Sequence, residues 1–294
     1  MGSNIVDGAA DSRLDYAIVT PSFRLDADRC ALLLESIDRH VAAHVKHYLV
    51  IDRRDVPLFK PIVSSRTQIL VVEDIVPNWL IRIPGIRRFW LSLRTPPVKN
   101  WILQQLVKLS IPSVVRENVL LYADSDVFFV RSFEPRELER DGKVPLFREV
   151  GQKGLISFND KWQAVASGLL GLPVESGCDT NFIGNVITWR RANVLAMCEH
   201  IERQFGRRWQ RSVVPLNVFS EYILYGLYEG RVLGTGSGHW HDAVTRTLCH
   251  WDPVPFDLAA LEAFRAKLRP EHHSVMISAK SRTAVSGIRQ VFFG

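Results

Sequence analysis

Short apolar runs, each ending at a polar residue, alternate with helical patterns in the first half of the chain. The runs lie at residues 16–20, 47–51, 68–72 and 120–123. Between the first two, residues 30–41 place apolar side chains at helical spacing. Strands that alternate with helices favour an α/β fold with a mostly parallel central sheet flanked by helices. Ligands of such sheets bind at the carboxyl ends of the strands.

The fourth run ends in Asp124-Ser125-Asp126, and a further apolar run, 127–130, follows directly. Two carboxylates one residue apart repel each other unless a cation lies between them. Hard divalent ions such as Mg²⁺ take such oxygen ligands and leave room for substrate phosphates. The alternative is a strand end with two solvated aspartates. We favour a metal site, because a polar island inside apolar sequence needs a reason.

Composition narrows the classes of partner. The chain has 294 residues, and its 37 basic and 31 acidic residues give a net charge of +6. This modest excess suits a nucleotide diphosphate or an anionic membrane surface and does not by itself indicate nucleic acid. Four scattered cysteines without a C-x-x-C pair argue against a disulfide framework or zinc site and favour a reducing cytoplasm. No signal peptide or membrane span is expected.

The helix expected at residues 101–109 has two faces. Ile102, Leu106 and Leu109 form an apolar stripe, whereas Gln105 and Lys108 belong to a neighbouring polar one. Amides and an amine on one stripe could bind a sugar or a phosphate. An exposed helix face has the same pattern, so the residues alone leave both interpretations open.

A second informative stretch is 219–228, where a helix is expected with Ser220 as its N-cap. Glu221 among aromatic residues could have a raised pKa and act as a general base on a hydroxyl. It could equally be a first-turn glutamate that interacts favourably with the helix dipole. We also expect strands at 144–147 and 183–189 and helices at 190–205 and 258–268.

Cationic and imidazole side chains gather late in the chain. A neutral histidine could complete a metal site begun by carboxylates, and His250 is our candidate among five. Lys280 could neutralise a leaving diphosphate or be solvated. Residues 79–94 mix aromatic and arginine side chains without an acid, which suits either an anionic membrane interface or a loop packed on the domain. Single-stranded nucleic acid is a weaker third interpretation.

Four blocks in order resemble a known family. They are Trp101-x-x-Gln104-Gln105-x-x-Lys108-Leu109, Tyr122-Ala-Asp-Ser-Asp126, Thr188-Trp189-Arg190-Arg191 and Ser220-Glu221-Tyr222-x-x-Tyr225-Gly226. An apolar strand ending in D-x-D after an α/β half resembles a GT-A-fold glycosyltransferase. Together the blocks, over residues 16–228, resemble the bacterial glycosyltransferase-like family DUF6492.

The resemblance implies a metal-dependent transferase that moves a sugar from a UDP- or GDP-sugar to a hydroxyl of a glycan or glycolipid. Mn²⁺ or Mg²⁺ would bind Asp126, Asp124 and His250 and bridge the donor diphosphate. The implied donor-binding residues are Thr20, Arg24, Asp52, Gln105, Lys108, Asp124, Ser125, Asp126 and Lys280. Glu221 would be catalytic, and Trp189 and Tyr222 would bind the acceptor.

We further expect a flexible terminus at 1–15 and one domain at 16–294. Its nucleotide-sugar half would span 16–130 and its acceptor half 131–294. The protein would be cytoplasmic, with peripheral contact to the inner membrane face through 79–94, and would not bind nucleic acid. Two other functions fit the motif. They are a haloacid-dehalogenase-like phosphatase, in which Asp124 would be the nucleophile, and a non-catalytic carbohydrate-binding protein.

Overall fold

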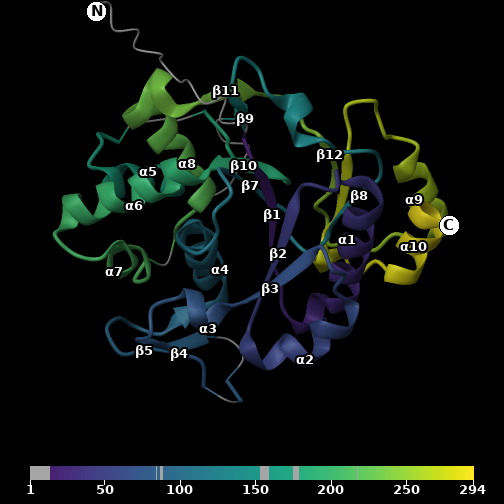
Figure 1. Cartoon of the computed structure of the whole chain (residues 1–294), viewed down its shortest axis with the longest axis horizontal. Helices are drawn as coiled ribbons and strands as arrows, with labels where there is room; N and C mark the ends of the chain where they lie inside the picture. The colour runs from purple at the N-terminus through teal and green to yellow at the C-terminus, as the bar shows by residue number, and fades with distance from the viewer. Residues whose placement is uncertain (1–13, 84, 87–88, 153–158, 175–178, 217) are drawn as a thin grey trace, which may run out of the picture.

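The computed structural model describes residues 14–294 apart from 84, 87–88, 153–158, 175–178 and 217, and Figure 1 shows its elements. The predicted flexible terminus lies almost entirely outside the described residues. The strands are β1 (Tyr16–Pro21), β2 (Lys46–Ile51), β3 (Thr67–Val71), β4 (Leu80–Ile81), β5 (Phe89–Ser92), β6 (Val98–Lys99), β7 (Val119–Tyr122), β8 (Val127–Phe129), β9 (Val144–Phe147), β10 (Ile187–Arg190), β11 (His239–Asp242), β12 (Thr247–His250) and β13 (Ser274–Ile277). The α-helices are α1 (Ala27–His40), α2 (Val56–Phe59), α3 (Val72–Ile75), α4 (Asn100–Ser110), α5 (Asn159–Leu170), α6 (Arg191–Phe205), α7 (Trp209–Val213), α8 (Glu221–Leu227), α9 (Leu258–Arg265) and α10 (Val285–Phe293).

The central sheet has the strand order β10-β7-β1-β2-β3. Its first four strands in chain order, β1, β2, β3 and β7, are parallel, and β10 pairs antiparallel with β7 at the edge. Strands β1, β2 and β7 are almost wholly buried, as expected for parallel strands covered on both faces, and the edge strand β3 is half-buried. The predicted α/β class with a mostly parallel sheet is therefore confirmed.

Alternate residues of β7 enter two different cores. Leu120 and Tyr122 pack into the core beneath α4, α6 and α8, whereas Val119 and Leu121 pack against residues of β1 and α1. Figure 1 shows the same arrangement, with α4, α6 and α8 on one side of the sheet and α1, α9 and α10 on the other. The carboxyl end of β7 therefore has one helical layer on each side.

A second sheet continues the chain beyond that end. β8 pairs antiparallel with β13, which in turn pairs parallel with β12. Because β7 and β8 flank Asp124-Ser125-Asp126, this sequence is the junction between the two sheets. Segments 150 residues later in the chain are thereby placed beside it.

Most of the expected elements are present, with shifted ends. The strand expected at 183–189 is β10 at Ile187–Arg190, and the helix expected at 258–268 ends at Arg265. The single apolar run expected through 120–130 is two strands, because the backbone turns at Asp124, where the carbonyl accepts the amide of Val127 at 3.1 Å. No pattern in the sequence predicted α5, α10, β11, β12 or β13. That residues 16–294 form one domain with two functional halves stays a prediction.

Candidate active site at the junction of the two sheets

Asp124 ends the central sheet and forms an ion pair with a buried lysine. Its Oδ1 lies 3.2 Å from Lys108 Nζ, and Lys108 Nζ lies at the same distance from Glu221 Oε1. Lys108 also donates a 2.7 Å hydrogen bond to Tyr222 Oη. Only 3% of the Lys108 side chain is exposed, against 37% for Asp124. One cation therefore joins the junction carboxylate to the start of α8.

The neighbouring carboxylates keep Lys108 protonated. Burial acts to lower the pKa of Lys108, but Asp124, Tyr222 and Glu221 outweigh it and hold that pKa well above its usual value. Burial raises the pKa of Glu221, and the ammonium group only partly offsets this effect. A charged lysine flanked by two carboxylates satisfies the requirement that buried charges be paired.

The buried cluster is held by α4 and α8 together. The Glu221 amide donates to Gln105 Oε1 at 3.0 Å, and Ser220 caps α8 by accepting from the Ile223 amide. Tyr122 Oη donates to the Lys108 carbonyl at 2.8 Å. Gln105 and Lys108 are 2% exposed, so the polar stripe of α4 is a buried binding face and not a solvated one. The Gln105 amide and the Lys108 ammonium both bind other groups of the protein.

Asp126 lies in a different environment, on the side of the second sheet. Its Oδ2 accepts a 3.0 Å hydrogen bond from the Ala279 amide. Burial first, and then the charge of Asp124, raise the pKa of Asp126 to about 6. Arg29 is near enough to lower that pKa, but its two terminal nitrogens donate to the carbonyls of Ile277 and Thr283. Asp126 is therefore a half-buried carboxylate whose charge is only weakly compensated.

A third carboxylate adds to the negative charge at the junction. Asp26, in the loop after β1, accepts a 3.3 Å hydrogen bond from Ser125 Oγ. Its pKa is raised mainly by burial and further by Asp124. Asp26 was not among the predicted site residues, although its place just beyond β1 was a usable signal, because the carboxyl ends of parallel strands meet at one edge.

The oxygen atoms at the junction suit a divalent cation only in part. Within the described ranges, no three His, Cys, Asp or Glu side chains lie close enough to form a metal site on their own. Asp126 uses Oδ2 for Ala279, and Asp124 Oδ1 faces Lys108 without accepting a hydrogen bond. Each carboxylate keeps a second oxygen. Two carboxylate oxygens fit a Mg²⁺- or Mn²⁺-type ion that takes its other ligands from substrate phosphates and water.

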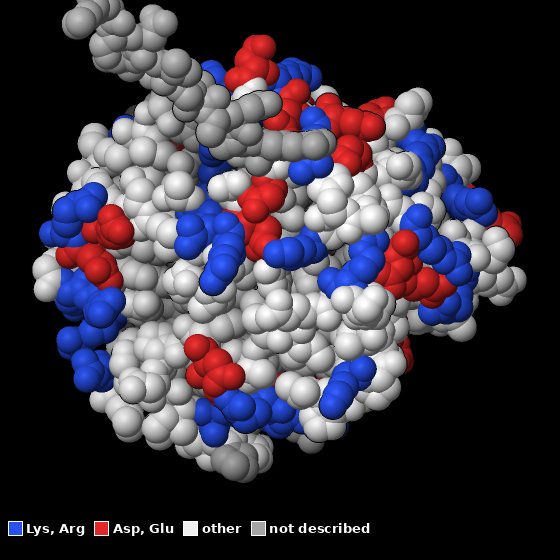
Figure 2. Space-filling view, in the orientation of Figure 1, with Lys and Arg blue, Asp and Glu red and all other residues white. Residues whose placement is uncertain are grey.

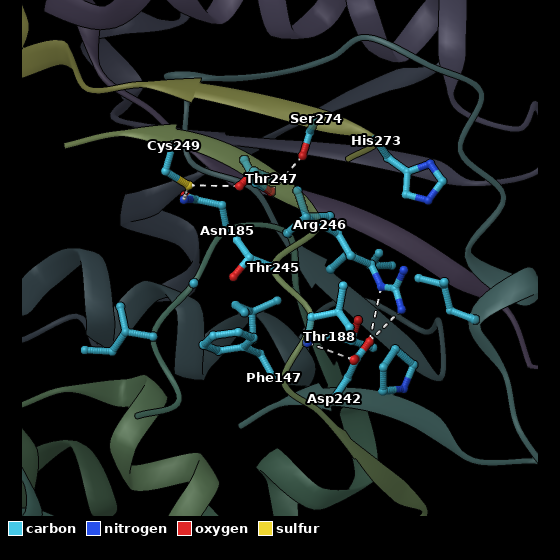
Figure 3. Close-up of a pocket in the computed structure, with 18 of the residues that line it drawn as sticks. Phe147, Asn185, Thr188, Asp242, Thr245, Arg246, Thr247, Cys249, His273 and Ser274 are labelled. Atoms are coloured by element: carbon cyan, nitrogen blue, oxygen red, sulfur yellow. Dashed lines mark hydrogen bonds and ion pairs between the residues drawn. The ribbon is translucent and has the colours of Figure 1, made fainter. Parts of the chain in front are cut away.

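A cavity of about 220 Å³ opens on the other face of the central sheet (Figure 3). It lies between β10, β12 and the segment before β12, and Leu121 and Thr188 form part of its wall. Cys249 belongs to the same wall. Burial and the charge of Asp126 both raise the pKa of the Cys249 thiol to about 11, so the cavity ends close to the junction.

A model of the family of unknown function DUF6492 matches residues 17–250, more than half of the chain. The chain belongs to DUF6492. This membership was predicted from the four sequence blocks and is confirmed. The match begins at β1 and ends at β12, so both sheets of this DUF6492 protein contribute to it.

Comparison with characterised proteins does not identify an activity. No curated protein matches this DUF6492 chain. Among solved structures, it is similar to the galactosyltransferase LgtC in complex with donor and acceptor sugar analogues. The identity is 12%, 94% of this chain and 95% of that chain are covered, and the TM-score is 0.44. A likeness at this level carries no argument about activity.

Two residues expected to bind the donor directly do not reach the surface of this DUF6492 protein. Thr20 is fully buried, and its hydroxyl lies 3.0 Å from His47 Nε2. Burial lowers the pKa of His47 to about 3, so this pair is a neutral core contact. Gln105 is committed to the Glu221 amide and the Trp101 carbonyl. The expectation that the Thr20 and Gln105 side chains contact the donor is therefore corrected.

The other donor candidates lie at the same edge of the sheet. Asp52 follows β2 and forms ion pairs with Arg54 at 3.2 Å and Arg82 at 3.5 Å. Arg24 is exposed after β1, and its amide donates to Asp55. Lys280 is exposed, one residue beyond the amide that binds Asp126. The roles of Arg24, Asp52 and Lys280 stay predictions.

His250 does not join the aspartate pair. Its Nε2 lies 2.8 Å from the Val254 carbonyl, and its ring stacks on Phe256 at 3.9 Å between centroids. No group of three metal-binding side chains includes it in the described part of the chain. His250 was chosen for its residue type late in the chain, but at the end of β12 its side chain packs in the apolar layer under α9. The expectation of His250 as third ligand is corrected.

The two residues expected to bind the acceptor are internal. Trp189 is fully buried. Its ring stacks on Tyr225 at 4.9 Å between centroids and meets the Tyr122 ring in a tilted contact at 4.6 Å. Tyr222 is 9% exposed and covers Lys108, with the ammonium 4.6 Å from its ring centroid. Both belong to the helical core beneath the sheet, so the assignment of Trp189 and Tyr222 to acceptor contact is corrected.

The basic aromatic stretch 79–94 is partly folded into a hairpin, with residues 84 and 87–88 outside the described part. Trp90 is 1% exposed, and the Arg82 guanidinium lies over its ring at 5.6 Å. Ile81 and Leu93 are exposed. No helix in the described part is long and apolar enough to span a bilayer. Figure 2 shows basic side chains interleaved with acidic ones over the face in view.

Proposed function

We propose that this DUF6492 protein is a metal-dependent glycosyltransferase that moves a sugar from a nucleotide-sugar donor to a hydroxyl of a glycan or glycolipid. One observation carries the proposal. Of two adjacent carboxylates at the carboxyl end of a parallel sheet, Asp124 has a buried lysine as counter-charge and Asp126 has none of comparable strength. A half-buried carboxylate with a raised pKa in such a place is a functional-site candidate.

The divalent ion, Mn²⁺ or Mg²⁺, would stabilise the charge that develops on the donor diphosphate as the sugar leaves. Asp126 would hold it through the oxygen that Ala279 does not use, and Asp124 through the oxygen that does not face Lys108. A UDP- or GDP-sugar would lie across the edge where Arg24, Asp52 and Lys280 are found. The remaining ligands of the ion would be phosphate oxygens, in keeping with the two-carboxylate donor set.

Burial changes the role that we assign to Glu221. A general base must reach the hydroxyl that it deprotonates, and this carboxylate is 4% exposed and lies 3.2 Å from Lys108 Nζ. We propose that Glu221 positions the lysine, and that the lysine in turn orients Asp124. The site could then leave the acceptor hydroxyl to be deprotonated by a group of the donor or by solvent.

Contact with the membrane through residues 79–94 and a cytoplasmic location stay predictions. The exposed Ile81 and Leu93 are compatible with an interfacial contact, whereas Trp90 and Arg82 are held by the protein itself. A glycolipid acceptor would make such a contact useful, because the hydroxyl to be modified would lie at the bilayer surface.

The test is donor binding and turnover. Wild-type protein should be stabilised against thermal unfolding by one class of nucleotide sugar only when Mn²⁺ or Mg²⁺ is present. Asp126→Asn should lose this metal-dependent shift and the turnover, whereas Asp160→Asn, an exposed first-turn aspartate of α5, should keep both.

Two other outcomes would replace the proposal. A phosphorylated Asp124 trapped with a phosphoester substrate would indicate the phosphatase. Glycan binding without turnover of any nucleotide sugar in the presence of Mn²⁺ would indicate the carbohydrate-binding protein.

A further inference from the structure

The cavity on the opposite face of the central sheet has a wall of neutral polar groups with unused hydrogen-bonding capacity. The hydroxyls of Thr188 and Thr245 and the Oδ1 of Asn185 have no hydrogen-bond partner among the described residues. Asn185 itself is anchored, since its Nδ2 lies 3.3 Å from Cys249 Sγ. Figure 3 shows these side chains around one space. Thr188 is buried, Asn185 is half-buried and Thr245 is exposed. Polar groups that line a concave site with free hydrogen-bonding capacity can fix the orientation of a polar ligand.

The charge of the wall excludes an anionic occupant. Arg246 is the cation of this wall, and Asp242 holds it at 2.7 Å through Nη2 and at 3.2 Å through Nε. Glu149 adds a second carboxylate. Two acids against one arginine would repel a phosphate, so the nucleotide end of a donor does not fit. The occupant should be neutral.

Apolar surfaces alternate with these polar groups. Phe147 and Ile183 line the cavity, and Trp251 stands at its rim with 61% of its surface exposed. An exposed tryptophan beside a polar cavity offers a flat face for a ring that is apolar on its faces and polar at its edge. A pyranose has this division, with C–H groups on its faces and hydroxyls around its edge.

One wall is built from strained, tightly packed backbone. Val186 has a φ of 55°, a left-handed conformation that is a genuine outlier for a β-branched residue. A Cβ at Gly184 would come within 2.9 Å of Ile187 Cδ1. Such strain persists only where the surrounding structure enforces it, and it is concentrated at ligand sites. The strain holds Asn185 between the two residues at the cavity surface.

We propose that this cavity binds one neutral pyranose unit, the terminal residue of the acceptor glycan. Binding of the sugar stands on the cavity alone, whereas its role as acceptor rests on the proposed function. Strand pairing connects the two sites, because Cys249 of the cavity wall lies opposite Met276 of β13, and Met276 lies opposite Val127, the residue after Asp126. A hydroxyl of the bound sugar would thus lie toward the metal-binding edge.

The test uses ligand-observed saturation-transfer NMR on the full chain. The probes are methyl β-D-galactopyranoside, methyl α-D-glucopyranoside and methyl α-D-mannopyranoside, with methyl β-D-glucuronide as an anionic counterpart. At least one neutral glycoside should bind, and the glucuronide should not. Thr188→Val, Thr245→Ala and Trp251→Ala should each weaken binding about fivefold, the loss expected for one neutral hydrogen bond or one ring contact.

Matched variants separate the two proposals. Trp101→Ala removes another exposed tryptophan, which lies outside the cavity wall, and should leave glycoside binding unchanged. Asp126→Asn should abolish metal-dependent donor binding but keep glycoside binding. The inference is overturned if no neutral glycoside binds, if the glucuronide binds equally well, or if the three cavity variants bind like wild type. If the wild type binds a neutral glycoside but no nucleotide sugar in the presence of Mn²⁺ or Mg²⁺, the proposed function alone is overturned.

Discussion

The two faces of the central sheet at β7 differ in packing: one is filled by paired charged side chains, and the other borders a cavity. Beneath Tyr122, the side chains of Lys108, Glu221 and Tyr222 fill the space and satisfy one another. Beyond Leu121, the sheet borders a cavity with unused hydroxyl and amide groups. On the first, closed face, the buried ion pairs hold Asp124 in place. On the second, open face, free polar groups can bond to a ligand. A sheet junction can thus hold a carboxylate rigidly from one side and leave room for a ligand on the other.

The largest effect is expected in the closed cluster. Lys108→Met leaves Asp124 and Glu221 without a counter-charge, and removing one partner of a buried ion pair costs about 3–5 kcal/mol of unfolding free energy. Urea unfolding measures the loss. Adding Glu221→Gln to Lys108→Met should recover part of it, because the second change removes an uncompensated buried charge. A loss below about 1 kcal/mol in the single variant would mean that the cluster is solvated.

A close packing contact links the two faces. A Cβ at Gly226 of α8 would come within 2.3 Å of the Phe182 ring, whose neighbours Asn181 and Ile183 line the cavity. Gly226→Ala should therefore cost about 2 kcal/mol of unfolding free energy and also weaken glycoside binding. Gly230→Ala, where no heavy atom lies within 4 Å, is the matched control. If Gly226→Ala leaves the cavity unaffected, the two faces are independent.

The two junction aspartates should respond in opposite directions. At pH 7 Asp126 is ionised although its pKa is raised to about 6, so its charge opposes folding. Asp126→Asn should therefore raise the unfolding free energy, by about 1 kcal/mol after screening at the sheet edge. This gain should disappear as the pH falls below 6, where the folded protein binds the proton. Asp124→Asn should instead destabilise, because Lys108 loses a partner. Equal effects of the two changes would remove the distinction between them.

The smallest effect on stability is expected at the open face. Thr188→Val replaces a hydroxyl that has no partner among the described residues by a methyl group of similar shape. The unfolding free energy should change by less than about 0.5 kcal/mol, as measured by urea unfolding, while glycoside binding weakens. A large loss of stability would show that the hydroxyl is part of the core and not a ligand group.

The local pattern of apolar residues predicted the central sheet. The contacts of the candidate site depend on pairing between segments that are distant in the sequence. The strands β1, β2 and β7 are mostly apolar and almost wholly buried, so their burial was readable, whereas the edge strand β3 is only half-buried. The spacing of Gln105 and Lys108 indicated one helix face, but not that Tyr222, 114 residues later, closes over it.

Burial overturned several residue assignments for the same reason. Thr20 and Trp189 are polar or amphipathic residues next to predicted ligand positions, and they are buried because β1 and β10 are covered on both faces. His250 was a candidate by residue type alone. No sequence signal marked Asn185 or the left-handed Val186, because their positions follow from the packing of β10 against β7 and β9.

The most direct test of the account locates the cation itself. Crystals of the full chain would be grown with Mn²⁺ and either UDP or GDP, and the anomalous signal of manganese would be mapped. The account predicts a peak in contact with Asp126 and a phosphate oxygen of one nucleotide, and its absence in Asp126→Asn. A manganese peak elsewhere, or a bound nucleotide without manganese at Asp126, would contradict the central claim.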